Sequence, residues 1–133
     1  MLNEKYQTGE KINNPLQVRE YFQFRLAEKK NEVFSALFLT NKHTILAYEE
    51  LFQGTIDSSS VHLRVVAQRS LELNSAAVIF AHNHPSGDPK PSESDSRITQ
   101  KLKDILGLFD IRVLDHIVVG TSGTVSLAEQ GLL

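Results

Sequence analysis

The chain has 133 residues, of which 41% are apolar and 23% are charged, and this balance predicts one compact domain rather than two. Lysine and arginine number 14 against 16 aspartate and glutamate residues, so the formal net charge of −2 does not support strong binding to nucleic acid. The sequence has no cysteine, which excludes disulfides, thiolate zinc sites and cysteine nucleophiles. A metal ion would therefore need His, Asp or Glu ligands.

Residues 1–13 are polar and aperiodic, and we expect a flexible lead-in to a single domain over residues 14–133. The sequence shows neither the apolar stretch of a secretory signal nor a membrane span, which predicts a cytoplasmic protein. The string Asn13-Asn14-Pro15 predicts the start of a helix that extends through Lys29. The apolar face of this helix would consist of Val18, Tyr21, Phe22 and Leu26.

The next segments alternate between strand and helix patterns. Residues 33–39 and 44–52 are apolar and flank a polar turn, which predicts a β-hairpin. Residues 54–60 are typical of a turn, and their three serines would cap a helix over residues 61–73. The unbroken apolar run of residues 76–81 then predicts a strand that is covered on both faces.

The C-terminal part begins with a loop over residues 85–91, which contains three of the four prolines. Ser92 opens a further helix, whose apolar stripe would consist of Ile98, Leu102, Ile105 and Phe109. Residues 111–119 predict another strand, and residues 125–127 would pair with it in a closing hairpin. This order of elements predicts an α/β fold with a mixed β-sheet flanked by helices.

The candidate metal ligands begin where the predicted apolar strand over residues 76–81 ends. His82 and His84 are two residues apart, so a strand places both imidazoles on one face, where they can converge on one ion. Asp95, in the first turn of the following helix, can supply a third ligand. Two histidines and one carboxylate leave a tetrahedral zinc ion with one open position, which is typical of catalytic zinc.

Hydrolysis at such an ion also needs a carboxylate that carries a proton. The spacing does not choose among the candidates, because a base can come from anywhere in the chain. The candidates are Glu32, Glu49, Glu50, Asp88 and Glu93.

The motif residues carry a family resemblance. The string His82-x-His84-Pro85, six residues, Ser92, two residues, Asp95 is similar to the JAMM (MPN+ or JAB) metalloprotease signature, H-x-H-P-x₆-S-x-x-D after a distant Glu. Residues 81–92, 50–55 and 115–120 further resemble the RadC branch of that superfamily. The resemblance covers the chain from Glu32 onward, and it implies a JAB/MPN fold, a cytidine-deaminase-like α/β sandwich.

The resemblance also implies roles for individual residues. His82, His84 and Asp95 would ligate one Zn²⁺ per chain, and Glu32, which opens the first strand, would be the general acid/base. Ser92 would stabilise the oxyanion of the tetrahedral intermediate. The implied activity is cleavage of a peptide or isopeptide bond by metal-activated water, with a peptide or protein as substrate.

Alternatives follow from the same resemblance. RadC relatives are associated with DNA repair and recombination, so the chain could instead be an accessory protein in those processes without hydrolase activity, or a catalytically silent scaffold. RadC chains usually carry a helix-hairpin-helix region before this domain, whereas nothing of that kind precedes Asn14 here. The chain also has Leu63 and Val65 where the family tends to have proline and glutamate.

The other three histidines and the edges of the hairpins give weaker indications of function. His43, His62 and His116 lack a second ligand at metal-like spacing, so we interpret each as a turn, cap or hydrogen-bonded strand residue, with Asp115-His116 the pair that most merits attention. The exposed edges of the hairpins could pair two copies in a homodimer.

Overall fold

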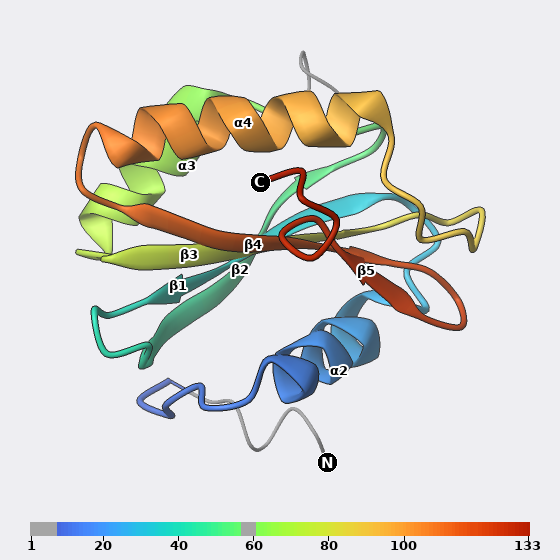
Figure 1. Ribbon diagram of the computed structural model, residues 1–133, viewed down its shortest axis with the longest axis horizontal. Helices are drawn as coiled ribbons and strands as arrows, with labels where there is room; N and C mark the ends of the chain where they lie inside the picture. Colours follow the sequence, from blue (N-terminus) through green and yellow to red (C-terminus); the bar gives the residue numbers. More distant parts are fainter. Residues whose placement is uncertain (1–7, 57–60) are drawn as a thin grey trace.

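The computed structural model describes residues 8–56 and 61–133 as one mixed sheet with helices on both faces (Figure 1). Helices α3 and α4 cover one face, and α2 covers the other (Figure 1). This arrangement confirms the predicted α/β fold class. In chain order the elements are α2 (Pro15–Leu26), β1 (Val33–Leu39), β2 (Ile45–Gln53), α3 (Leu63–Glu72), β3 (Ala77–Asn83), α4 (Glu93–Gly107), β4 (Arg112–Val119) and β5 (Thr124–Ser126).

The strand order in the sheet is β2-β1-β3-β4-β5. Strand β1 pairs antiparallel with β2 and with β3, and β4 pairs antiparallel with β5. Strands β3 and β4 are parallel, and α4 forms the crossover between them. The predicted hairpin over residues 33–39 and 44–52 and the predicted closing hairpin are therefore both confirmed, and β3 lies at the centre of the sheet.

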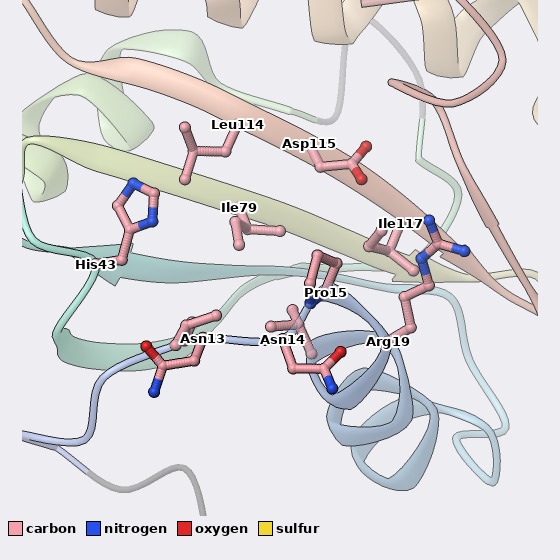
Figure 2. Close-up of a pocket in the computed structure, with 11 residues that line it drawn as sticks. Asn13, Asn14, Pro15, Arg19, His43, Ile79, Leu114, Asp115 and Ile117 are labelled. Carbon is pink, nitrogen blue, oxygen red and sulfur yellow. The ribbon is translucent and has the colours of Figure 1, made fainter.

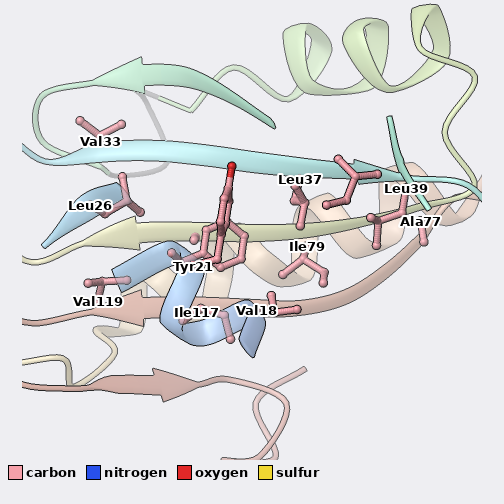
Figure 3. Packing of buried hydrophobic residues seen from close by; sticks show 13 residues of the cluster. Val18, Tyr21, Leu26, Val33, Leu37, Leu39, Ala77, Ile79, Ile117 and Val119 are labelled. Carbon is pink, nitrogen blue, oxygen red and sulfur yellow. The ribbon is translucent and has the colours of Figure 1, made fainter. Parts of the chain in front are cut away.

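Strand β3 is buried along its whole length because it faces a separate core on each side. Ile79 and Ala81 belong to the core under α2, which also contains the four α2 residues predicted to be apolar contacts (Figure 3). Val78 and Phe80 belong to the core under α3 and α4. The alternation of side chains along a strand explains why one unbroken apolar run supplies both cores.

Several boundaries differ from the sequence-based expectations. Helix α2 ends at Leu26, and the predicted α4 stripe is wrong at its last position, because Phe109 lies beyond the helix and is 48% exposed. Leu106 is buried instead. The serines at 58–60 lie outside the described residues, and the N-cap residue of α3 is His62.

Residues 8–13, the described part of the segment predicted as a flexible lead-in, contact the start of β2 and the turn before it. The N–H of Gly9 donates to the carbonyl of Ile45, and the N–H of Ile12 donates to the carbonyl of His43. Lys11 also forms a bridge with Thr44. No helix in the part of the chain that the structure describes is both long and apolar enough to cross a membrane.

Strand β4 contains an irregularity that changes which face its residues occupy. Val78 of β3 pairs with Val113, but Ile79 pairs with Asp115, so Leu114 is an extra residue on β4. Such a bulge interrupts the strict alternation of side chains. Val113 and His116, three residues apart, consequently both contact the side of the sheet that α4 covers.

The loop after β3 packs closely on the turn after β4. The N–H of His84 donates to the carbonyl of Val119, and the N–H of Thr121 donates to the carbonyl of Gly87. A Cβ added at Gly120 would collide with the Gly87 carbonyl and lie 2.8 Å from Cδ of Pro89. Only glycine therefore allows this approach of the two segments.

We predict that Gly120→Ala lowers the free energy of unfolding by about 1–3 kcal/mol, because the added methyl group must displace backbone of the neighbouring loop. Urea unfolding followed by circular dichroism measures this loss. Gly123→Ala is the matched control, since a Cβ there would meet no atom within 4 Å. Equal stability of the two variants would contradict the predicted collision.

Candidate metal centre

Three separate segments bring nitrogen and oxygen atoms that could ligate a metal ion to the C-terminal end of β3. His82 faces α4 from the end of β3, and its Nε2 lies 3.1 Å from Nε2 of His84. Asp95, in the first turn of α4, places Oδ1 3.0 Å from Nε2 of His82 and Oδ2 3.1 Å from Nε2 of His84. Glu32, just before β1, places Oε2 3.7 Å from Nε2 of His82.

The geometry of these groups fits one metal ion. Ligand atoms of Glu32, His82 and His84 all lie within 4.8 Å of one another. Two nitrogens bound to one tetrahedral zinc ion would be about 3.3 Å apart, close to the observed 3.1 Å between the imidazoles. Nitrogen and carboxylate ligands also suit zinc chemically. The group of Glu32, His82 and His84 could therefore hold a metal ion, with the Asp95 carboxylate beside it.

The start of α4 fixes the position of Asp95. The Ser92 Oγ accepts a hydrogen bond from the Asp95 N–H, and the Ser92 N–H donates to Oδ2 of Asp95, which makes a reciprocal capping box. Burial raises the pKa of the Asp95 carboxyl, but hydrogen bonds with His82 and His84 outweigh burial and leave the pKa well below its usual range. Asp95 is therefore a carboxylate near neutral pH although only 1% of it is exposed.

The orientation of His84 is fixed by the loop that follows it. Nδ1 of His84 lies 2.9 Å from the carbonyl oxygen of Asp88, and a carbonyl can only accept, so Nδ1 carries a proton. In the neutral ring Nε2 then has its lone pair directed at the cluster. The hydrogen bond with Asp95 raises the pKa of His84, so a metal ion at this site competes with a proton for Nε2.

Glu32 is the one of the five candidate carboxylates that reaches this cluster. Its Oε1 accepts a hydrogen bond from the N–H of Ile56, while Oε2 points toward His82. Glu49 instead forms a two-pronged ion pair with Arg69. The other three have partners elsewhere: the hydroxyl of Tyr48 for Glu50, the N–H of Lys90 for Asp88, and Arg97 for Glu93.

Asn83, which lies between the two histidines, has a structural function that the sequence did not reveal. Its side chain points away from the histidine cluster, where Oδ1 accepts a hydrogen bond of 2.7 Å from the Val33 N–H. Its Nδ2 donates to the carbonyls of Lys29 and Asn31. These three bonds hold the turn that carries Glu32 against the end of β3.

His116 is a second residue whose role the sequence did not predict. The sequence predicts a turn, cap or hydrogen-bonded strand residue here, and the structure places His116 on β4 with its Nε2 2.7 Å from Nδ1 of His82. It is fully buried, and burial holds the pKa of its imidazole well below the usual range. The only signal in the sequence was its place in the Asp115–Gly120 string, because the bulge that turns it toward α4 has no local sequence pattern.

A cavity of about 260 Å³ lies on the other face of the sheet, between the N-terminal end of α2 and strands β3 and β4 (Figure 2). Its floor is apolar, with Ile79 and Ile117, and its rim includes Arg19 and Asp115. Arg19 pairs with Glu129, and Asp115 accepts hydrogen bonds from Ser126 and Ala128. The side chains of Arg19 and Asp115 therefore bind residues 126–129 of the C-terminal segment.

Comparison with known proteins shows the family of the chain. A model of the RadC-like JAB domain family matches residues 12–132. The chain belongs to this family. A UPF0758 protein of Vibrio cholerae is 53% identical to this RadC-like JAB domain over 133 residues, which are all of the chain and 84% of that relative. UPF0758 proteins of Nitrosococcus oceani and Marinobacter nauticus are 54% and 48% identical, and the chain spans 59% of the length of each.

We predict that Asn83→Ala destabilises the RadC-like JAB domain by about 1–3 kcal/mol, because it leaves the buried Val33 N–H without an acceptor. Urea unfolding measures this loss. Asn31→Ala is the control: its carbonyl stays in place and its side chain is exposed, so the change should stay within about 0.5 kcal/mol. An Asn83→Ala chain as stable as the control would show that the clamp on the Glu32 turn contributes nothing.

Proposed function

We propose that this chain is a zinc-dependent hydrolase of the JAMM type that cleaves peptide or isopeptide bonds. The observation that carries the proposal is the convergence of two imidazole nitrogens and two carboxylates from three separate segments. One imidazole nitrogen can donate a single hydrogen bond, yet Nε2 of His82 faces Glu32, His84 and Asp95 at once. A metal ion can bind several of these nitrogen and oxygen atoms at once, whereas a single proton on Nε2 can bond to only one of them.

In this proposal His82, His84 and Asp95 hold one zinc ion per chain. Zinc supplies Lewis-acid chemistry: it makes water nucleophilic near neutral pH and polarises a carbonyl group. Three protein ligands leave the open position that catalytic zinc needs. Family membership and the nitrogen and oxygen atoms that His82, His84 and Asp95 bring together support zinc as the ion.

Glu32 would be the general acid/base. Its Oε1 is anchored by the Ile56 N–H, which leaves Oε2 to take up and return a proton. The 3.7 Å between Oε2 and Nε2 of His82 is too long for a hydrogen bond, and no hydrogen bond from residues 8–56 or 61–133 occupies this carboxylate oxygen. The carboxylate side chain is 19% exposed, so a substrate can reach it.

Ser92 would stabilise the oxyanion. Its Oγ accepts a hydrogen bond from the Asp95 N–H, and within residues 8–56 and 61–133 no bond uses the hydroxyl proton. That proton can therefore be donated to an oxygen that gains negative charge in the transition state. We propose a peptide or protein rather than nucleic acid as the substrate, because the net charge of −2 provides no attraction for phosphates.

We predict that the purified wild-type chain binds about one zinc ion per chain and that the double variant His82→Ala/His84→Ala binds none, because each substitution removes a nitrogen ligand. Elemental analysis after zinc loading and desalting measures the metal content. The control is His43→Ala, since His43 lies on the turn before β2, away from the cluster. Wild-type chain that retains no zinc would contradict the proposed metal site.

We predict that Glu32→Gln retains zinc and the fold but loses peptide-bond hydrolysis by at least 100-fold, because the amide cannot accept the proton. The assay is mass spectrometry of new termini in a mixed library of linear and isopeptide-linked peptides. Glu49→Gln is the matched control, because Glu49 pairs with Arg69 outside the cluster. Equal cleavage by wild type and Glu32→Gln would assign the proton transfer to another group, and no cleavage by zinc-loaded wild type would contradict the proposed reaction.

A further inference from the structure

We propose that His116 and Thr99 are positioning residues that fix the proton of His82 on Nδ1 and thereby direct its Nε2 lone pair at the metal site. The proposal rests on the proposed function, since it takes His82 as a metal ligand. It extends that function to two residues outside the ligand motif. Three buried contacts, starting at α4, fix the positions of the protons in turn.

The first contact fixes the Thr99 hydroxyl. Thr99 Oγ1 lies 2.7 Å from the backbone carbonyl oxygen of Asp95, one turn earlier on α4. A carbonyl oxygen has no proton, so the hydroxyl must donate in this bond. A hydroxyl has only one proton, and Oγ1 can therefore only accept in its other hydrogen bond.

The second contact fixes the tautomer of His116. Nδ1 of His116 lies 2.5 Å from Thr99 Oγ1, and because this oxygen can only accept, Nδ1 must carry the proton. A neutral imidazole has one N–H, so Nε2 of His116 then carries the lone pair. Burial makes the neutral ring the relevant form, because His116 and Thr99 are both fully inaccessible to solvent.

The third contact transmits this arrangement to His82. Nε2 of His116 lies 2.7 Å from Nδ1 of His82, and since Nε2 of His116 accepts, Nδ1 of His82 must donate. When Nε2 of His82 carries no proton, as metal binding requires, the ring keeps its proton on Nδ1 and directs the Nε2 lone pair at His84, Asp95 and Glu32. Metal-binding histidines generally need such a partner on the other ring nitrogen, and His116 provides it here.

Packing holds the His116 ring in the required place. The ring lies edge-on to Phe34, with centroids 5.6 Å apart, and its centroid is 6.4 Å from that of Phe80. The β4 bulge at Leu114 places the residue on this face. The chain of contacts begins at the Asp95 carbonyl and ends at a nitrogen that faces the Asp95 carboxylate, so one proposed ligand helps to orient another.

The test uses two matched pairs of variants in the full chain. His116→Phe keeps a buried ring but has no acceptor, whereas His116→Gln keeps an acceptor oxygen for the His82 Nδ1–H. Thr99→Val keeps the side-chain shape but has no hydroxyl, whereas Thr99→Ser keeps one. Zinc affinity is measured by competition with a chromophoric chelator, and the ring protons of His82 and His116 are assigned in ¹⁵N-edited NMR spectra of the metal-free chain.

We expect His116→Phe and Thr99→Val to bind zinc about 10- to 100-fold more weakly than wild type, the usual effect of losing such a partner. We expect His116→Gln and Thr99→Ser to stay close to wild type. The wild-type spectrum should show protons on Nδ1 of both histidines and none on Nε2 of His116. A purely structural role would not distinguish the members of each pair.

The proposal is overturned if Nε2 of His116 carries the proton, or if folded Thr99→Val binds zinc as tightly as Thr99→Ser. Should His116→Phe fail to fold, the threonine pair and the wild-type spectrum decide the question alone. If wild type binds no zinc, the proposed function fails, whereas the spectrum still shows whether the tautomers are fixed as described.

Discussion

The pleat of β3 is the constraint on which the site depends. Successive residues of a strand point to opposite faces, so His82 enters the space under α4 while Asn83 faces the other way. Asn83 then binds the turn that carries Glu32, and His82 faces the Glu32 carboxylate. The same two residues therefore bring a proposed ligand and the proposed base together, and a slip of one residue in the pairing of β1 with β3 would separate them.

Buried polar groups at this end of the sheet depend on one another. Asp95 is almost fully inaccessible, and its carboxylate is compatible with burial because the Ser92 N–H and two imidazoles contact it. The capping box that looks like an ordinary helix start thus also directs a carboxylate into the cluster. Structural and proposed catalytic roles coincide in Ser92 and Asp95, so sequence spacing alone could not separate them.

Local patterns were sufficient to predict most of the elements, because burial in two cores leaves a clear apolar run in β1 and β3. The pairing of His82 with His84 could likewise be inferred from the period of a strand. Contacts that depend on irregular backbone could not be inferred. The bulge at Leu114 reverses the face of His116, and the Asn83 clamp joins segments 50 residues apart. Leu106 replaced Phe109 in the core because α4 ends at Gly107.

The separation of Glu32 from His82 along the chain has a consequence for folding. The two residues meet only when β1 pairs with β3, and Asp95 and His116 join them only when α4 and β4 have docked on the sheet. An unfolded chain offers an ion little more than the two neighbouring imidazoles. An ion that binds the complete cluster would therefore favour the folded chain by mass action and link thermal stability to metal supply.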